Sequence, residues 1–545
     1  MGDSWWRGGV IYQVYPRSFQ DSNGDGCGDL NGITSRLDYI AELGVDAIWI
    51  SPFLKSPMKD FGYDVMDYRD VDGIFGTLDD FDKLIAQAHE RDIKVMMDLV
   101  ISHTSDQHPW FIESRRGSGN PKSDWYVWAD ASPDGTPPNN WLSVFGGPAW
   151  QWDTTRCQYY LHNFLTSQPD LNFHNSEVQR EILSIADFWM RRGVDGFRLD
   201  TINFYFHDHL LRDNPIMPPE QRNSNIAPAV NPYNHQDHVY DRNRPENLKF
   251  LEALRAVMDK YEDRAAVGEV GDAIRGLDLI AEYTQGDNRM HMCYAFDLLG
   301  PKKLNPARVR QMMSNFYSTA PDSWPCWALS NHDVMRHATR LTGDDATADS
   351  EARMLAGLLL SLDGSICLYQ GEELGFEEAN VPFEALQDPY GIAFWPEFKG
   401  RDGCRTPMVW DGAAPHGGFS EAPQTWLPVC EEHLPKAVSS QTDRADSMLV
   451  HYRELLAMRK SNPALRNGRI EFLETTEDDL LVFLRRSESQ TILCLFNMGG
   501  EAARFNLPVD KKWRPIKAGH FTADWQDAYV EVCGFGAAWA EREGG

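Results

Sequence analysis

Short apolar runs alternate with longer amphipathic stretches through most of the chain. The apolar runs, which predict buried strands, lie at 10–16, 47–52, 94–100, 196–202, 265–270, 291–298, 326–333 and 366–371. The amphipathic stretches, whose apolar spacing predicts helices, lie at 33–44, 78–92, 176–193, 247–261 and 351–362. Strands that alternate with helices of this length predict a parallel α/β sheet, and eight of them are most economically arranged as a closed (β/α)8 barrel.

Two parts of the chain depart from this alternation. Residues 104–174 follow the third strand, are rich in Trp, Pro, Gly and Asn, and predict a small inserted subdomain. Short alternating strands, which predict a separate β domain after a helix at about 446–459, lie at 469–473, 480–485, 491–497 and 529–533. The expected fold class is therefore α/β: a (β/α)8 TIM barrel with an inserted subdomain after strand 3 and a C-terminal antiparallel β-sandwich. The barrel domain is expected at 1–103 and 175–459. The inserted subdomain is expected at 104–174, and the C-terminal domain at 460–545.

Composition narrows the classes of function. The net charge of −29 over 545 residues repels nucleic acid and anionic membrane surfaces, so neither is expected as a partner. No apolar run reaches the ~18 residues of a membrane span, and the first residues lack the basic and apolar segments of a signal peptide. The nine cysteines are scattered without a CxxC pair, which favours free thiols and a cytoplasmic location.

Charged residues interrupt the apolar strand predicted at 196–202. Strand side chains alternate, so Arg198 and Asp200 share one face, and Phe197 and Leu199 share the other. An Arg and an Asp on the face of an apolar strand are costly to bury unless they are paired or used. From this stretch alone, two interpretations of Arg198 and Asp200 are about equally supported: a structural ion pair and a reactive pair.

Other predicted strands end in the same kind of residue. Reactive groups in such barrels lie at the carboxyl ends of the strands. Residues that could carry chemistry fall at or just beyond those ends: Asp98, His103, Arg198, Asp200, Glu269, His332 and Asp333. Acids that converge from four strand ends predict one active site.

At these positions the chain resembles the α-amylase superfamily, glycoside hydrolase family 13. The matching motifs lie at 98–103 (DLVISH), 196–200 (GFRLD), 268–270 (GEV) and 330–333 (SNHD). The chain resembles the α-glucosidase and oligo-1,6-glucosidase branch through 168–172 (QPDLN), 9–16 (GVIYQVYP) and 371–375 (GEELG). The resemblance runs from about residue 5 to 460.

The resemblance implies a retaining mechanism in which Asp200 is the nucleophile, Glu269 the acid/base and Asp333 the transition-state stabiliser. Retention requires the first two carboxyl groups to lie about 5–5.5 Å apart. Arg198 would keep Asp200 ionised, whereas Glu269 must be desolvated or placed beside negative charge to stay protonated.

The resemblance also implies a set of glucose-binding residues. They are Asp60, Tyr63, His103, Arg198, His332 and, less securely, Arg401. Tyr63 would lie under the sugar ring, and Asp60 with Arg401 would close the pocket and make the enzyme exo-acting. Without the surrounding motif Asp60 would count as an ordinary loop acid. Three aromatic residues, which could equally be plain packing, are weaker candidates for pocket walls: Phe145, Phe164 and Phe204.

A loop at 21–29 (DSNGDGCGD) is dense in oxygen ligands. Asp21, Asn23 and Asp25 follow the spacing of a cation-binding loop, the Cys27 carbonyl could add a ligand, and Asp29 closes the loop. The twelfth position is Gly32 rather than Glu, so this loop is no EF-hand. Similar loops in the resembled branch hold Ca²⁺ or Mg²⁺ in a structural role, and a metal-free acidic turn stays open.

The most detailed expectation concerns which glycosidic linkage the enzyme cleaves. In the resembled branch the residue after the nucleophile is usually Val in enzymes that cut α-1,6 bonds, and here it is Thr201. We expect an α-1,4-preferring exo-α-glucosidase that acts on maltose and short oligosaccharides, with some glucosyl transfer. The alternatives are an oligo-1,6-glucosidase (isomaltase) and a dedicated glucosyltransferase acting on sucrose or trehalose. A non-catalytic transporter partner of the same fold would lack the acids. The oligomeric state is left open.

Overall fold

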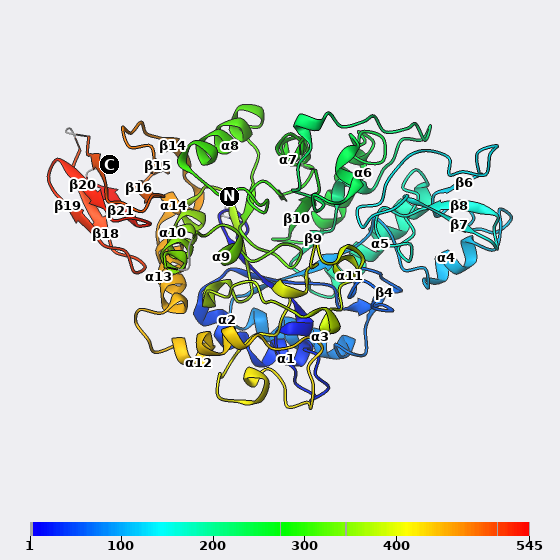
Figure 1. The fold of residues 1–545 in the computed structure, drawn as a ribbon, viewed down its shortest axis with the longest axis horizontal. Helices are drawn as coiled ribbons and strands as arrows, with labels where there is room; N and C mark the ends of the chain where they lie inside the picture. The colour runs from blue at the N-terminus through cyan, green and yellow to red at the C-terminus, as the bar shows by residue number, and fades with distance from the viewer. Residues whose placement is uncertain (1–3, 273, 344–345, 509–510, 544–545) are drawn as a thin grey trace.

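Eight parallel strands form the centre of the molecule in the computed structural model, which describes residues 4–272, 274–343, 346–508 and 511–543 (Figure 1). The strands are β1 (Val10–Val14), β2 (Ala47–Ile50), β5 (Lys94–Leu99), β9 (Gly196–Leu199), β10 (Ala265–Val270), β11 (Met292–Ala295), β12 (Cys326–Ala328) and β13 (Ser365–Tyr369). Each pairs in parallel with its neighbours in chain order, and β13 returns to β1. A parallel bridge between Cys293 and Pro325 joins β11 to β12 and closes the (β/α)8 barrel that the sequence predicts.

Helices follow the strands and cover the barrel from outside. They are α1 (Leu30–Ser35), α2 (Leu37–Leu43), α3 (Leu78–His89), α5 (Ser176–Arg191), α6 (Asn247–Met258), α7 (Gly276–Thr284), α8 (Pro306–Thr319), α10 (Ala348–Ser361) and α13 (Met448–Ser461). Shorter helices are α4 (Pro109–Ser114), α9 (His337–Arg340), α11 (Pro389–Phe394), α12 (Val438–Gln441) and α14 (Pro463–Asn467). The helix expected at 33–44 is split, because Arg36 leaves the helical region (φ −111°, ψ 10°) and Asp29 caps a new start at α1.

All of the barrel strands except β10, which matches its predicted bounds, are shorter than the apolar runs that predict them. Strand β9 ends at Leu199 and β12 at Ala328, so Asp200, His332 and Asp333 lie in the loops just beyond. At Thr201 the chain turns sharply with a left-handed backbone (φ 39°, ψ 53°). A β-branched residue rarely adopts this conformation, so the surrounding structure must enforce it.

An insertion follows β5, as expected. Its sheet consists of β6 (Trp128–Ala129), β8 (Gln158–Leu161) and β7 (Trp150–Asp153), with its own apolar cluster around Trp141 and Trp150. A backbone bridge between His103 and Asp170 and a hydrogen bond from the Leu171 amide to the Ser102 carbonyl (3.0 Å) tie the insertion to the barrel. A separate hairpin of β3 (Leu54–Lys55) and β4 (Asp67–Val71) precedes α3. These ties place the insertion over the carboxyl ends of the barrel strands.

The C-terminal part consists of two antiparallel sheets. One contains β14 (Arg469–Phe472), β15 (Leu480–Arg486), β16 (Thr491–Asn497), β21 (Ala537–Arg542) and β18 (Trp513–Ile516), in that order. The other contains β17 (Ala503–Asn506), β20 (Tyr529–Val532) and β19 (Ala523–Trp525). Leu, Val and Phe side chains from both sheets form a shared apolar cluster, as in a sandwich. Figure 1 shows this part at the opposite end of the molecule from β6–β8.

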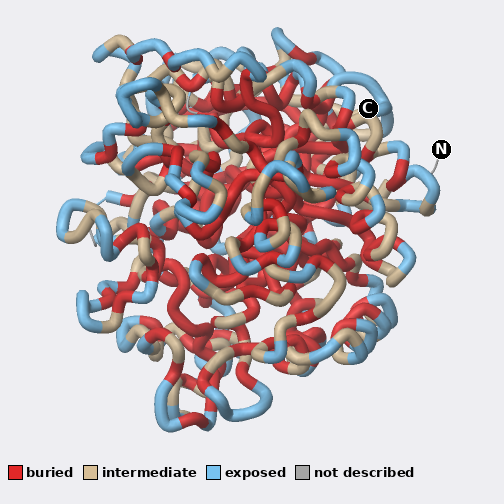
Figure 2. Tube along the Cα trace, turned by 90° about the vertical axis from the view of Figure 1, so that its right-hand side faces the viewer, coloured by how far each residue is buried: buried red, intermediate tan, exposed pale blue. Residues whose placement is uncertain are grey.

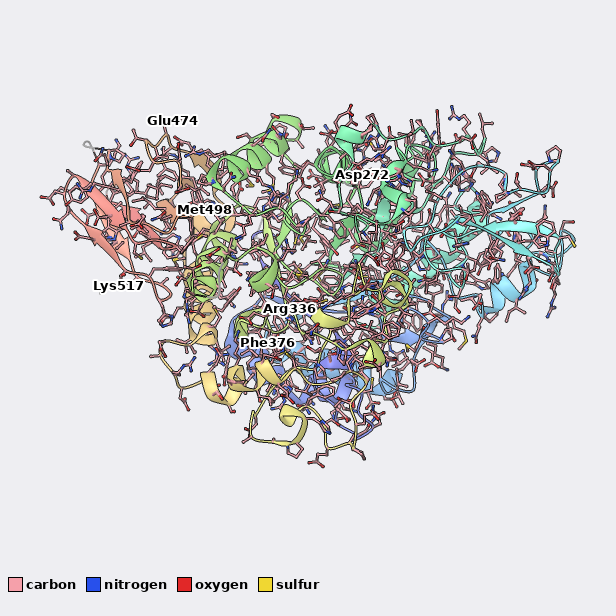
Figure 3. The ribbon with its side chains drawn as sticks, in the orientation of Figure 1. Asp272, Arg336, Phe376, Glu474, Met498 and Lys517 are labelled. Atoms are coloured by element: carbon pink, nitrogen blue, oxygen red, sulfur yellow. The ribbon has the colours of Figure 1, made fainter. Side chains whose placement is uncertain are left out.

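Burial follows the barrel. Figure 2 shows buried chain through the interior and exposed chain on the outer loops. Some charged side chains in the interior form hydrogen bonds with the backbone. Arg336, for example, donates to the carbonyls of Gln370 and Cys404 and lies beside Phe376 (Figure 3). All nine cysteines lie in the described part of the chain, and each is a free thiol. Every helix in that part is too short or too polar to cross a lipid bilayer.

Candidate active site

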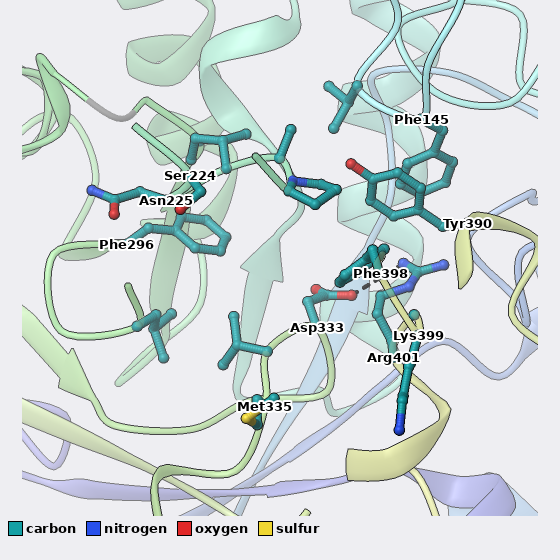
Figure 4. A pocket seen from close by; sticks show the side chains of 18 of the residues that line it. Phe145, Ser224, Asn225, Phe296, Asp333, Met335, Tyr390, Phe398, Lys399 and Arg401 are labelled. Atoms are coloured by element: carbon teal, nitrogen blue, oxygen red, sulfur yellow. Dashed lines mark hydrogen bonds and ion pairs between the residues drawn. The ribbon is translucent and has the colours of Figure 1, made fainter. Parts of the chain in front are cut away.

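The carboxyl ends of the barrel strands open into a cavity of about 540 Å³. Ten of the residues proposed from the sequence for catalysis or glucose binding line it: Asp60, Tyr63, His103, Phe145, Phe164, Asp200, Phe204, Glu269, Asp333 and Arg401. Arg198 and His332 lie directly behind this lining, in contact with it. Figure 4 shows Asp333 between a side with Phe145 and Tyr390 and a side with Asn225 and Phe296.

The Arg198 guanidinium joins three acids from three strands. Its Nη1 lies 2.9 Å from Asp98 Oδ1 and 2.6 Å from Asp200 Oδ1, and its Nη2 lies 2.7 Å from Glu269 Oε2. The Arg198 side chain is fully buried. Alternation along β9 places Arg198 inside the barrel, so the pair found in the sequence is part of the site rather than an isolated ion pair. The sharing of one guanidinium sets Asp200 and Glu269 next to each other.

Three carboxyl groups around one guanidinium cannot all be ionised cheaply in a buried site. Burial raises the pKa of Glu269 to about 8, and the negative charges of Asp200 and Asp333 add to this effect against the opposing charge of Arg198. Burial likewise raises the pKa of Asp98 to about 7. Glu269 Oε2 accepts from Arg198 and from the Thr201 amide (3.1 Å), whereas Oε1 has only the longer contact from the Tyr294 hydroxyl (3.4 Å) among the described residues and is therefore the oxygen better placed to carry the proton.

Asp333 has the opposite environment. Its Oδ1 lies 3.2 Å from Arg401 Nη1 and 3.0 Å from Arg405 Nη2, and His332 Nε2 lies 3.1 Å from its Oδ2. Burial works against ionisation of Asp333, but His332, Arg401 and Arg405 outweigh it and hold the pKa of this carboxyl below its usual range. The site thus contains one carboxyl group kept ionised beside one kept protonated.

Arg401 closes one end of the cavity. Its Nη2 lies 2.8 Å from both Asp60 Oδ1 and Asp388 Oδ1. Gln168, from the inserted subdomain, donates to Asp60 Oδ2 (3.0 Å). The resulting block of ion pairs joins the loop after β2, the inserted subdomain and the loop after β13, so the cavity ends there.

Tyr63 lines the cavity near this closed end, and His332 supports it from behind. Their rings stack at 5.2 Å with an interplanar angle of 4°. The Tyr63 hydroxyl donates to Asp98 Oδ2 (3.0 Å) and contacts His332 Nε2 (2.5 Å). The ring of His103 is held by the Ser102 hydroxyl and the Tyr63 carbonyl. Burial lowers the pKa of His103 and of His332, and the negative charge of Asp333 works against this effect at His332.

The three aromatic candidates form one wall. Phe145 and Phe164 are 5.7 Å apart between ring centroids, and Phe164 and Phe204 are 5.5 Å apart. The Arg401 guanidinium lies 5.0 Å from the ring of Phe145. This wall combines the inserted subdomain with the turn after β9.

The loop at 21–29 lies outside the cavity lining. Both carboxylate oxygens of Asp21 accept hydrogen bonds, from the amides of Asn23, Gly24 and Gly26 and from the Ser420 hydroxyl. Asp29 instead caps α1 by accepting from the Gly32 amide. The oxygen ligands of this loop are of the type that a hard cation prefers. Within the described residues, however, no three or more Asp, Glu, His or Cys side chains lie close enough together to hold a metal ion.

Sequence reasoning gave no role to several residues of the site. Tyr294 donates to Glu269 Oε1 (3.4 Å) and lies 3.0 Å from Arg198 Nη2. It stands directly opposite Glu269 in the β10–β11 register, so strand pairing could have found it. Asp388 and Arg405 come from the long loop after β13, where no periodicity marks them.

Comparisons with known proteins agree with this geometry. The family described as "Alpha amylase, catalytic domain" matches residues 13–468. A probable alpha-glucosidase of Rhizobium meliloti (strain 1021) is 61% identical over 536 residues, which cover 98% of this chain and 97% of that protein. An oligo-1,6-glucosidase of Heyndrickxia coagulans is 38% identical over 551 residues, which cover 94% of this chain and 95% of that protein.

A solved structure extends the similarity to three dimensions. The crystal structure of the alpha-glucosyl transfer enzyme XgtA superposes with a TM-score of 0.95 at 54% identity and covers 99% of this chain and 100% of that one. A family match that spans the whole barrel and relatives that span nearly the whole chain establish the family. The chain belongs to the alpha-amylase family and is a glycoside hydrolase.

Proposed function

We propose that this protein is a retaining, exo-acting α-glucosidase that removes terminal α-1,4-linked glucose from maltose and short oligosaccharides. One observation supports the proposal most directly. The buried guanidinium of Arg198 lies 2.6 Å from Asp200 Oδ1 and 2.7 Å from Glu269 Oε2, at the carboxyl ends of the neighbouring strands β9 and β10. Two adjacent carboxyl groups, one of which keeps its proton through a raised pKa, are what retaining glycoside cleavage requires.

In the first step Asp200 attacks the anomeric carbon of the terminal glucose. The bond from that carbon to the glycosidic oxygen breaks, and Glu269 gives its proton to the departing oxygen. Arg198 binds the nucleophile through Asp200 Oδ1 (2.6 Å), and Asp333, kept ionised by Arg401 and Arg405, is placed to bind sugar hydroxyls as positive charge develops on the ring.

In the second step water opens the glucosyl ester on Asp200. Glu269 takes a proton from the water, whose oxygen attacks the anomeric carbon, and the Asp200 carboxylate leaves. The negative charge of Asp200 contributes to the raised pKa of Glu269. Ester formation removes that charge, so the pKa of Glu269 falls in the intermediate and Glu269 becomes the base that this step needs. Two displacements retain the α configuration.

Exo action follows from the closed end of the cavity. Asp60, Arg401 and Asp388 block the space beyond the glucose site, so no further sugar unit fits on the non-reducing side. The same two polar groups, Asp60 and Arg401, are placed to bind the terminal hydroxyls. Maltose and other short substrates therefore suit the site better than starch.

Linkage, transfer, metal and location belong to the same proposal. Thr201 lines the cavity beside the nucleophile, and its hydroxyl lies 3.3 Å from Asp200 Oδ2, which supports an α-1,4 preference. An alcohol in place of water would give glucosyl transfer. We propose that the loop at 21–29 binds Ca²⁺ or Mg²⁺ in a structural role. Nine free cysteines support a cytoplasmic location.

The alternative is that the main activity is α-1,6 cleavage or glucosyl transfer. It is favoured by the names of two relatives, the oligo-1,6-glucosidase and the alpha-glucosyl transfer enzyme. Initial rates on maltose, isomaltose, sucrose and trehalose distinguish these activities, and a large isomaltose preference would overturn the proposed linkage.

The anomeric form of the first-formed product tests the mechanism. We expect NMR of a maltose digest to show α-glucose before mutarotation, and Asp200→Ala to abolish the signal. First-formed β-glucose would contradict the role of Asp200. Glu42→Gln, an exposed change on the outer helix α2, is the control and leaves the rate unchanged.

A further inference from the structure

The cavity has two chemically different halves. The half around Asp200 combines the charged groups of the site with the wall of Phe145, Phe164 and Phe204, and it ends at the ion pairs of Arg401 with Asp60 and Asp388. The other half opens to solvent past Met335, whose side chain is 47% exposed although it lines the cavity. Since the inner half ends blindly, whatever is attached to the glucose must occupy the outer half.

Apolar side chains from three separate segments line this outer half. They come from the loop between β9 and α6, from the segment after β11 and from the segment after β12: Ile226, Ala227, Phe296, Leu299, Val334 and Met335. Ala227 and Leu299 are buried, and Ile226, Phe296 and Val334 are half-buried. Figure 4 shows Phe296 and Met335 on the side away from Phe145 and Tyr390.

Three charged side chains that line the cavity are already occupied within the protein. Arg340 donates to the carbonyls of Leu298, Gly300 and Leu329. Glu378 Oε2 accepts from the Arg336 amide (2.9 Å). Lys399 donates to Asn380 Oδ1 (2.8 Å). A second sugar ring here would therefore lose water from its hydroxyl groups and gain few partners, whereas an apolar group would lose little.

We propose that the subsite for the leaving group, which receives the second glucose of maltose, favours an apolar aglycone, an alkyl or aryl group, over a second sugar. This inference rests on the proposed α-glucosidase activity and specifies its substrate class. The apolar segments stand on the leaving-group side because the blocked end lies on the other side of Asp200.

The same subsite receives the acceptor in transfer. The hydroxyl oxygen of an apolar alcohol attacks the anomeric carbon of the glucosyl ester, its proton passes to Glu269, and the bond to Asp200 breaks with release of the carboxylate. The balance is that of hydrolysis with the alcohol in place of water. Apolar alcohols are thus better acceptors than glucose at equal concentration.

A series of linear alkyl α-glucosides tests the inference. Methyl, butyl and hexyl α-glucoside leave as alcohols of similar acidity, so differences in kcat/KM report binding of the alkyl chain rather than chemistry. Full burial of one methylene is worth about a fourfold gain. We expect kcat/KM to rise at least about tenfold from methyl to hexyl, because part of the chain stays in solvent.

Two variants locate the effect. Ile226→Asn and Met335→Asn each place an amide on the apolar wall, and we expect the increase with chain length to fall to a third or less. Leu210→Asn is the matched control: this side chain is 74% exposed and does not line the cavity, so the increase persists. Unchanged chain-length dependence in both wall variants would overturn the inference.

The outcomes separate the inference from the function on which it rests. If kcat/KM is equal for all three alkyl glucosides while each is hydrolysed with retention, the apolar subsite is wrong and the α-glucosidase stands. If no alkyl glucoside and no maltose is hydrolysed, the proposed function fails and the inference with it.

Discussion

Glu269 must hold a proton in the free enzyme and give it up in each turnover. Burial raises its pKa to about 8, so at pH 7 most molecules carry the proton and above pH 8 most have lost it. Because kcat/KM reports ionisations of the free enzyme, we expect its alkaline limb near pH 8, with a tenfold loss for each further pH unit. A pH profile with maltose checks this, and full activity at pH 10 would contradict it.

The variant Glu269→Gln tests the assignment of that limb. An amide keeps the shape but neither donates nor accepts a catalytic proton, so we expect a loss of about 10²–10⁴-fold in kcat with maltose. With an aryl α-glucoside, whose leaving group needs little protonation, the first step survives and its alkaline limb disappears. Persistence of the limb in the variant would assign it to another group, such as Asp98.

Thr201 is the residue on which the linkage preference depends. The change Thr201→Val keeps the β-branched shape, so it adds no new strain to the left-handed backbone, but it removes the hydroxyl that contacts Asp200 Oδ2 and Ser102 Oγ at 3.3 Å. We expect the ratio of isomaltose to maltose initial rates to rise several-fold, whereas Thr201→Ser, which keeps the hydroxyl, leaves it within twofold. Equal ratios in the wild type and the valine variant would remove Thr201 as the determinant.

Individual residues of the site show which features can be predicted from the sequence alone. Strand alternation places Arg198 beside Asp200, and the barrel rule brings Glu269 and Asp333 to the same end, so the reactive centre is predictable. Asp388 and Arg405 are not, because they lie in a long loop that only tertiary packing positions. The roles of Asp60 and Arg401 came from the family resemblance, since a loop acid has no distinguishing pattern of its own.

At the scale of elements, hydrophobic pattern predicts which strands exist better than where they end. The run at 326–333 contains a strand of only three residues, because the polar residues after Ala328 belong to the active-site loop. In the C-terminal part, β17, β18, β19 and β21 were not predicted; β18, for example, contains Pro515 and is largely exposed on both faces. Edge strands of this kind depend on neighbours that the local sequence does not reveal.

The loop at 21–29 is the element whose role depends on a cation. Hydrogen bonds from Ser420 and backbone amides outweigh burial and lower the pKa of Asp21, so the loop is acidic and ordered near neutral pH. If the loop binds Ca²⁺, a concentration 100-fold above Kd stabilises the fold by about 2.7 kcal/mol, and Tm rises after EDTA-treated protein is supplied with Ca²⁺.

The exposed Asp25 provides the matched variant for this loop. Asp25→Ala removes a proposed ligand while the Asp21 hydrogen bonds that shape the loop remain. We expect its Tm to be independent of Ca²⁺. If wild type and variant both ignore millimolar Ca²⁺ and Mg²⁺, the loop is an acidic turn without a metal.

At the scale of the whole molecule, the C-terminal sheets are bound to the barrel through buried contacts. Trp539 of β21 is fully buried, and its Nε1 donates to Ser361 Oγ at the end of α10 (2.9 Å). Arg485 of β15 donates to the Ser361 carbonyl, also from a buried position. Since the active-site loop after β12 leads into α10, the C-terminal part supports the barrel on the side that carries Asp333.

The contact through Trp539 predicts that the two parts unfold together. Removal of a buried Trp side chain costs about 3–5 kcal/mol, so Trp539→Ala should lower the Tm of the whole protein, and the temperature at which activity is lost should fall with it. Calorimetry combined with residual activity measures both, and Trp152→Ala, a side chain 37% exposed on the inserted subdomain, is the control. If Trp539→Ala instead splits unfolding into two transitions, with activity lost only at the wild-type temperature, the C-terminal domain folds independently and does not stabilise the site.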